Sequence, residues 1–136
     1  MKKNKILLIT AICLLVVISI VLVFVNKVQK RPFKNLEVTD IKSASVELFP
    51  PGETIQIAEF GELVKYLNDI VIYNEDNSYT EYNGQVVTFI ITMTDGTQTT
   101  IMAYNPFLVI DGVGYKTPSV PYEDLNAYAN RLLDDK

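Results

Sequence analysis

Residues 86–104 read VVTFIITMTDGTQTTIMAY and consist of two apolar, β-branched runs on either side of a short polar turn. Such runs are typical of β-strands, and an Asp-Gly pair between them is a strong hairpin signal because both turn positions tolerate a positive φ. We therefore predict an antiparallel hairpin closed by a two-residue turn at Asp95-Gly96. With that turn the apolar residues meet on one face of the hairpin. The predicted pairs are Val87 with Tyr104, Phe89 with Met102 and Ile91 with Thr100.

A second hairpin follows from the same kind of turn. Residues 107–110 and 113–116 flank Asp111-Gly112, so we predict another two-residue turn between two further short strands. Pro118 comes soon afterwards and ends the sheet, because proline has no backbone N–H to donate to a neighbouring strand.

The segments around the hairpins complete one small domain. Apolar residues recur at i, i+3, i+4 and i+7 in residues 58–68, and a similar stripe occurs in residues 122–133, which predicts two amphipathic helices. Extended segments are expected before and after the first helix, and a long polar loop is expected before the first hairpin. The predicted extended segments are 36–48, with a bulge or bend at 40–43, then 54–57 and 70–73; the predicted loop is 74–84.

This pattern predicts an α+β fold for residues 35–136. The expected order is strand, helix, four or five antiparallel strands, and helix. We expect both helices on one face of the sheet, because two amphipathic stripes are most economically buried against one apolar surface. About 100 residues leave no room for a second domain.

Residues 6–25 form an uninterrupted apolar run of 20 residues without a charge. At about 1.5 Å per residue, a helix of this length spans about 30 Å, the thickness of a hydrocarbon core. A cleaved secretory signal is the alternative, but its apolar region is usually about 7–15 residues long and ends at a small-x-small site, which residues 25–30 lack. We therefore expect an uncleaved anchor that contacts the lipid bilayer. Cys13 is expected to be an apolar side chain within it.

The anchor divides the chain into four predicted segments. Basic residues flank the span on both sides, so the positive-inside rule alone does not fix its orientation. A short tail that begins with MKK is typical of a bacterial signal anchor whose bulk is exported, so we expect a single-pass cell-membrane protein with an extracellular C-terminal domain. The segments are a cytoplasmic tail (1–5), the transmembrane anchor (6–25), a basic juxtamembrane linker (26–34) and an extracytoplasmic domain (35–136).

Charge is segregated along the chain and excludes several function classes. Residues 1–34 carry seven basic residues and no acid, whereas residues 35–136 carry five basic residues and all 16 acids, which gives +7 and −11. An acidic domain repels phosphate backbones, so we expect no nucleic-acid partner. The domain has neither histidine nor cysteine, which removes imidazole and thiol catalysis and the commonest zinc sites. We expect no enzyme activity, no cofactor and no metal.

The polar loop at 74–84 contains the candidate binding residues. Tyr73, Tyr79 and Tyr82 lie in it or beside it, and exposed tyrosines supply a large contact area with a polar tip. We therefore predict that these three tyrosines form a binding surface. The alternative is that they fold back on the sheet while the neighbouring acids stay solvated. A calcium site in the same loop is a weaker hypothesis, because the alternating ligand spacing is missing.

Several short motifs occur in order along the domain. They are DIKSASV at 40–46, Pro50-Pro51-Gly52, Gly84 before a strand, Asp95-Gly96, and IDGVGY at 110–115. Over about residues 35–133 this pattern resembles small domains of unknown function from Gram-positive cell envelopes, which are carried behind one membrane anchor or a lipoprotein signal. The resemblance implies a place in the envelope; it implies no particular activity and no functional residues.

These features together predict a membrane-anchored, non-enzymatic module outside the cytoplasm. Its expected partner is an unknown envelope protein or wall component, which it binds or assists. Two alternatives stay open: an immunity-type or inhibitor protein at the cell envelope, and a hydrolase of wall polymers that uses carboxylates such as Asp95 and Asp111. The hydrolase needs two carboxylates about 5–10 Å apart around a cleft, whereas both aspartates are already explained as turn residues.

Overall fold

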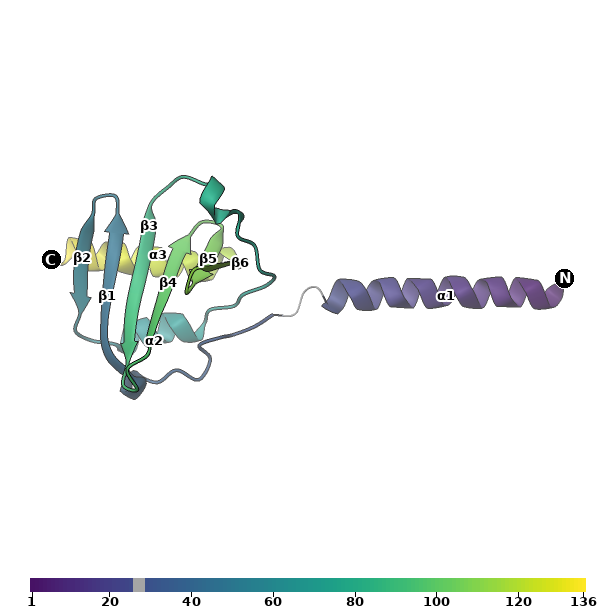
Figure 1. Cartoon of the computed structure of the whole chain (residues 1–136), viewed down its shortest axis with the longest axis horizontal. Helices are drawn as coiled ribbons and strands as arrows, with labels where there is room; N and C mark the ends of the chain where they lie inside the picture. The colour runs from purple at the N-terminus through teal and green to yellow at the C-terminus, as the bar shows by residue number, and fades with distance from the viewer. Residues whose placement is uncertain (26–28) are drawn as a thin grey trace.

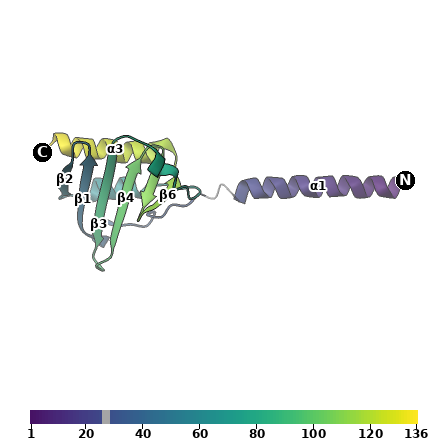
Figure 2. The ribbon, with the colours of Figure 1, turned by 45° about the horizontal axis from the view of Figure 1, so that its top comes forward.

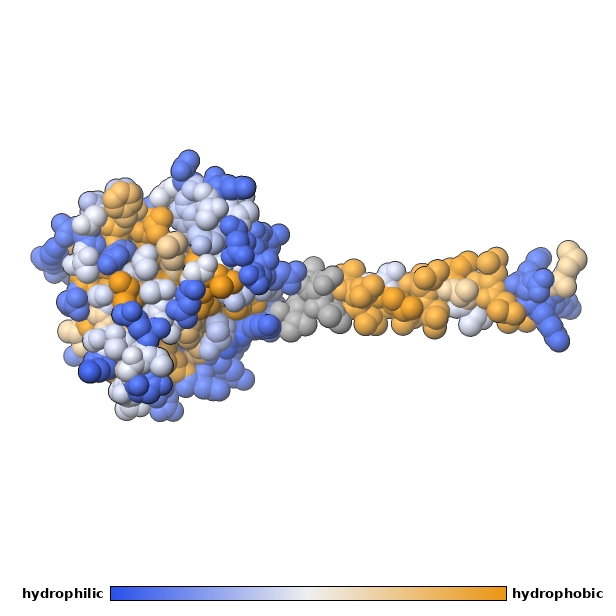
Figure 3. Space-filling model, in the orientation of Figure 1, coloured by the Kyte–Doolittle hydropathy of each residue, from blue (hydrophilic) through white to orange (hydrophobic). Residues whose placement is uncertain are grey.

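The computed structural model describes residues 1–25 and 29–136, which form a long N-terminal helix and a six-stranded sheet with two more helices (Figure 1). Residues 26–28 of the predicted linker 26–34 lie outside the described residues. Helix α1 (Lys2–Val25) contains the predicted span and is long and apolar enough to cross a membrane. In the space-filling view its apolar side chains form one band that follows a hydrophilic N-terminal end (Figure 3).

The domain is built on one antiparallel sheet with the strand order β2-β1-β3-β4-β5-β6. Together with the helices, this sheet confirms the predicted α+β fold. The observed order after α1 is β-β-α-β-β-β-β-α. The strands are β1 (Ile41–Phe49), β2 (Glu53–Ile57), β3 (Val86–Met93), β4 (Gln98–Tyr104), β5 (Phe107–Ile110) and β6 (Val113–Lys116).

Two helices cover one face of this sheet, as predicted. Helices α2 (Gly61–Asn68) and α3 (Ser119–Asp134) both lie behind the strands (Figures 1 and 2). Their apolar stripes meet the inward side chains of the strands in a single core. The largest fully buried side chains are those of Val46, Leu48, Leu63, Leu67, Ile70, Val87, Phe89, Ile91, Ile101, Leu108 and Leu125.

The ends of several elements differ from the prediction. Helix α3 begins at Ser119 rather than at 122, because Pro121 in the first turn removes an N–H that has no partner within the helix. Helix α2 begins at Gly61 rather than at 58. The first strand begins at Ile41 rather than at 36, since Val38–Asp40 form a short 3₁₀ helix, η1. The predicted bulge near its start is confirmed by a register shift between Ile41 and Ser43.

The prediction of a strand at residues 70–73 is wrong. Ile72 forms only an isolated bridge with Lys30, in which each N–H donates to the other residue's C=O at 2.8 and 2.9 Å. Tyr73 N–H donates to the C=O of Lys116 at 2.8 Å, so the segment is held between the incoming chain and the end of β6. Its apolar alternation reflects burial, since Ile70 and Ile72 belong to the core, and not a strand of the ladder.

The first hairpin forms as predicted, but its register differs by one residue. Phe89 pairs with Ile101 instead of Met102, because the turn holds the three residues Thr94, Asp95 and Gly96 and not two. Gly96 has a φ of 89°, the left-handed position typical of three-residue hairpin loops. The shift turns Ile101 into the core and Met102 to the face without helices. Val87 likewise pairs with Ala103 and Ile91 with Thr99.

The second hairpin is confirmed in full. Ile110 pairs with Val113 around a two-residue turn, and both turn residues, Asp111 and Gly112, have positive φ values of 49° and 85°. The Asp111 carboxylate accepts a hydrogen bond from the backbone N–H of Thr100 at 2.8 Å. This aspartate therefore serves the turn and its neighbouring strand, as the sequence indicated.

Candidate functional site

Two of the three predicted binding tyrosines lie together over the end of the sheet. The rings of Tyr79 and Tyr82 both contact the buried ring of Phe107, with centroid distances of 6.5 and 5.2 Å. The Tyr79 hydroxyl donates to the C=O of Gly112 at 3.2 Å, and the Tyr104 hydroxyl donates to the C=O of Tyr82. Both tyrosines are thus folded back onto β5 and β6, although Tyr82 keeps 48% of its surface exposed.

Tyr73 does not join this pair. Its N–H is bonded to Lys116 at the end of β6, and its hydroxyl accepts a hydrogen bond from the Gln29 side chain at 3.5 Å. The structure therefore separates the three predicted residues into a packed pair and a single tyrosine beside the incoming chain. A binding surface made by all three remains a prediction.

Asp76 and Asn77 of the same loop bond to neighbouring residues and hold the loop in place. Asp76 N–H donates to Gly114 O at 2.8 Å, and Gly114 N–H donates to the side-chain oxygen of Asn77 at 2.9 Å. The Asp76 carboxylate accepts bonds from the hydroxyl and the N–H of Ser78, and with the nearby ammonium of Lys116 these hold the pKa of Asp76 below its ordinary value. These contacts close the β6 edge of the sheet.

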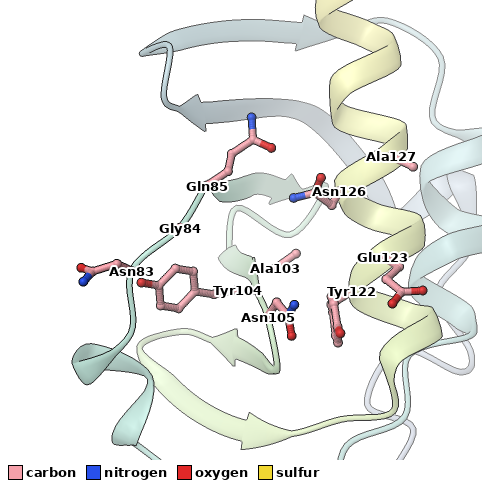
Figure 4. A pocket seen from close by; sticks show the side chains of 10 residues that line it. All are labelled: Asn83, Gly84, Gln85, Ala103, Tyr104, Asn105, Tyr122, Glu123, Asn126 and Ala127. Atoms are coloured by element: carbon pink, nitrogen blue, oxygen red, sulfur yellow. The ribbon is translucent and has the colours of Figure 1, made fainter.

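A pocket of about 450 Å³ lies between the first half of α3 and the strands, where β3 begins and β4 ends (Figure 4). Three separate segments supply its wall: the residues just before β3, the end of β4 with the following turn, and one face of α3. The lining residues are Asn83, Gly84, Gln85, Ala103, Tyr104, Asn105, Tyr122, Glu123, Asn126 and Ala127.

A chain of carboxamides holds one end of this pocket. Gln85 and Asn130 exchange hydrogen bonds through their side chains at 3.2 and 3.4 Å, and Gln85 also donates to the C=O of Pro50 at 3.1 Å. Asn130 in turn donates to both the C=O and the side-chain oxygen of Asn126, at 2.8 and 3.0 Å. Gln85 and Asn126 are therefore fixed in orientation, as a binding site requires of its polar groups.

The chemistry of the lining is polar and nearly neutral. Four carboxamides and two phenols surround the pocket, and Glu123 is the one carboxylate among the ten lining residues. A carboxamide offers a donor and an acceptor in one plane, and tyrosine adds an aromatic face. Asn83 and Asn105 are the exposed carboxamides of this lining, whereas Gln85 and Asn126 are half-buried. Such a wall suits an uncharged ligand with many hydroxyl or amide groups.

Sequence reasoning missed this pocket. Its residues come from segments up to 44 positions apart, from Asn83 to Ala127, and none belongs to a chemical motif. The one local signal is the i, i+4 spacing of Tyr122 and Asn126, which puts a ring and an amide on one helix face.

Within residues 1–25 and 29–136, no group of three or more histidine, cysteine, aspartate or glutamate side chains is placed to hold a metal ion. The carboxylates that a calcium site in the loop at 74–84 would need include Asp76, which already bonds Ser78. No family model, curated protein or solved structure matches the chain, so its site is defined by the geometry of its own residues.

Proposed function

We propose that this protein is a membrane-anchored, non-enzymatic binding module whose α3 pocket holds an uncharged glycan. The observation that carries the proposal is the lining: Asn83, Gln85, Asn105 and Asn126 with the ring of Tyr122. Carboxamides match the paired donors and acceptors of neighbouring hydroxyl and acetamido groups. An aromatic face packs well against the C–H face of a sugar ring. An acetamido sugar chain, a component of bacterial walls, satisfies both requirements.

The same lining argues against the hydrolase hypothesis. Hydrolysis of a glycosidic bond generally uses two carboxylates, one as acid and the other as nucleophile or base. Glu123 alone lines the pocket, and its side chain is exposed at the surface of α3. Binding without cleavage is the function that these residues support.

The proposal places the domain outside the cytoplasm, in keeping with its resemblance to envelope domains. The apolar helix α1 supplies the tether. Only four residues separate Val25 at its end from Lys30, whose backbone is bonded to Ile72 of the domain. The five Cα–Cα steps from Val25 to Lys30 reach at most about 18 Å, so the domain would be held close to the bilayer.

The pocket is tested by removing its two exposed amides. We expect the full-length chain in detergent micelles to bind a tetramer of N-acetylglucosamine, and the double variant Asn83→Ala, Asn105→Ala to bind it about tenfold more weakly, as expected when two hydrogen bonds of about 0.5–1.5 kcal/mol each are lost. Isothermal titration calorimetry gives both dissociation constants. Asn35→Ala, an exposed amide that does not line the pocket, is the matched control. No heat with the wild type, or equal affinity in the double variant, would contradict the proposal.

Membrane orientation is tested separately with a single thiol. Thr80 is exposed in the short helix η2 (Ser78–Glu81), so Thr80→Cys presents a reactive group without disturbing the core. We expect an impermeant maleimide to label this variant in intact cells, whereas Cys13 within α1 stays unlabelled in the wild type. Labelling that appears only after lysis would place the domain in the cytoplasm and remove the envelope proposal.

A further inference from the structure

One edge of the sheet is covered by a loop, and the other edge is open. At the β6 edge, Tyr73 and Asp76 donate to the backbone of β6, and Lys116 N–H donates back to Asn74 at 3.1 Å, so residues 73–76 cover that edge. At the opposite edge, β2 pairs with β1 alone within the described part of the chain. Alternate backbone N–H and C=O groups of such an edge strand point away from its single partner and remain available for another strand.

An apolar groove of about 370 Å³ runs beside this open edge, between β2 and the C-terminal half of α3. Ile55, Ile57, Tyr128 and Leu132 line it, and the first two face the helices because they pair with the buried Ala44 and Val46. Burial raises the pKa of Tyr128 to about 12, so its phenol is neutral at physiological pH. The part of the wall formed by these four residues is therefore uncharged and suits an apolar side chain.

Acidic side chains stand at the rim of the groove. Glu59, Glu62 and Asp135 line it with one base, Lys136. Arg131 is bonded to Glu62, and Lys136 is bonded to Glu53. Neither Glu59 nor Asp135 takes part in an ion pair within the described residues, and both are exposed. The rim therefore attracts a cationic segment, and it disfavours a second copy of this acidic domain edge to edge.

We propose that the β2 edge binds an extended, basic peptide segment of a partner protein by strand addition. The peptide backbone bonds to the free groups of β2, and its alternate side chains point into the groove, as in other complexes formed at open sheet edges. Lysine or arginine residues at other groove-facing positions of the same peptide lie near Glu59 and Asp135, which line the groove on that side of the sheet. The chain enters the domain through Lys30 and Ile72 beside the β6 end, so the tether does not obstruct the β2 edge.

The test uses an eight-residue peptide in which valine and lysine alternate at the four groove-facing positions and serine fills the positions between them, with the full-length chain in detergent micelles. We expect this basic peptide to slow amide hydrogen exchange at residues 53–57, and the same peptide with glutamate in place of lysine to leave exchange unchanged. The double variant Glu59→Gln, Asp135→Asn should bind the basic peptide at least fivefold more weakly by fluorescence anisotropy. The affinity of this double variant for the peptide should also change less with salt concentration, because the variant lacks two of the surface charges that salt screens.

The matched control removes two exposed carboxylates elsewhere, Glu47→Gln on the other face of the sheet and Glu81→Gln in the loop, with the same change in net charge. This control should keep the wild-type affinity, and so should the pocket variant Asn83→Ala, Asn105→Ala, because the two sites share no lining residue. If the control variant binds the basic peptide as weakly as the Glu59→Gln, Asp135→Asn variant does, the effect is a general electrostatic attraction to the acidic domain, and the proposal is overturned. Protection of residues 53–57 without peptide, rising with protein concentration, would show that a second copy occupies the edge instead.

Discussion

Replacing Gly114 by alanine is expected to lower the free energy of unfolding by about 2–3 kcal/mol, the upper part of the range of about 1–3 kcal/mol for forcing an extra group into a packed site. A Cβ at this position would lie 2.3 Å from the backbone oxygen of Asp76 and 2.6 Å from Cδ1 of Tyr79. The first contact is with backbone, so no change of rotamer relieves it. The segment at 76–79 must move away from β6, and its hydrogen bonds to Gly114 are then lost.

Displacement of this segment has a second consequence for stability. The rings of Tyr79 and Tyr82 cover Phe107, which is 3% exposed, and the neighbouring Val109 is also 3% exposed. Both apolar side chains face away from the helices, and on that face the loop covers Phe107. We therefore expect faster hydrogen exchange at β5 and β6, in addition to the lower midpoint in a urea titration.

Gly61→Ala is the matched control for this substitution. A Cβ at Gly61 meets no atom within 4 Å, and the residue begins helix α2. Alanine there should leave stability unchanged or raise it by up to about 1 kcal/mol, since alanine favours a helix over glycine. If Gly114→Ala proved as stable as Gly61→Ala, the loop would not be packed on β6 as described.

The position of this loop could be predicted from the sequence, whereas its packing could not. Its position and its polar, turn-rich character were predicted from residues 74–84, because turn composition is a local property. Its packing on β6 does not follow from the sequence, because contacts such as Asp76 with Gly114 join residues 38 positions apart. Nothing local distinguishes Gly114 from any other glycine within a strand; only the segment lying over it explains why a side chain is excluded there.

The candidate site was less predictable than the fold, for a related reason. Amphipathic stripes and Asp-Gly turns repeat along the chain and report on buried faces, so the helices, the hairpins and the shared core could be inferred. The amides of the pocket form no motif in the sequence, because they meet only when the fold brings together the start of β3, the end of β4 and the first half of α3. Exposed tyrosines are typical of binding surfaces, yet the rings of Tyr79 and Tyr82 both contact Phe107.

The register of the first hairpin gives the second large effect. We expect Ile101→Ala to lower the free energy of unfolding by about 3–4 kcal/mol, within the range for truncating a fully buried aliphatic side chain. Ile101 is fully buried and pairs with Phe89 on the helix-covered face of the sheet. The adjacent Met102 is half-buried on the opposite face, so Met102→Ala should cost about 1 kcal/mol or less. Urea titrations of both variants measure the difference.

The ranking of these two variants depends on the turn alone, because a shift of one residue exchanges the two faces of a strand. A two-residue turn at Asp95-Gly96 would put Met102 opposite Phe89 in the core and turn Ile101 outward, and Met102→Ala would then be the costly substitution. Thr97 selects the longer turn: its N–H and hydroxyl both donate to the Asp95 carboxylate, at 2.9 and 2.6 Å. Those bonds hold the pKa of Asp95 below its ordinary value and leave Gly96 in the left-handed position. A larger loss at Met102 than at Ile101 would therefore refute the three-residue turn, and with it the assignment of residues to the core face of β4.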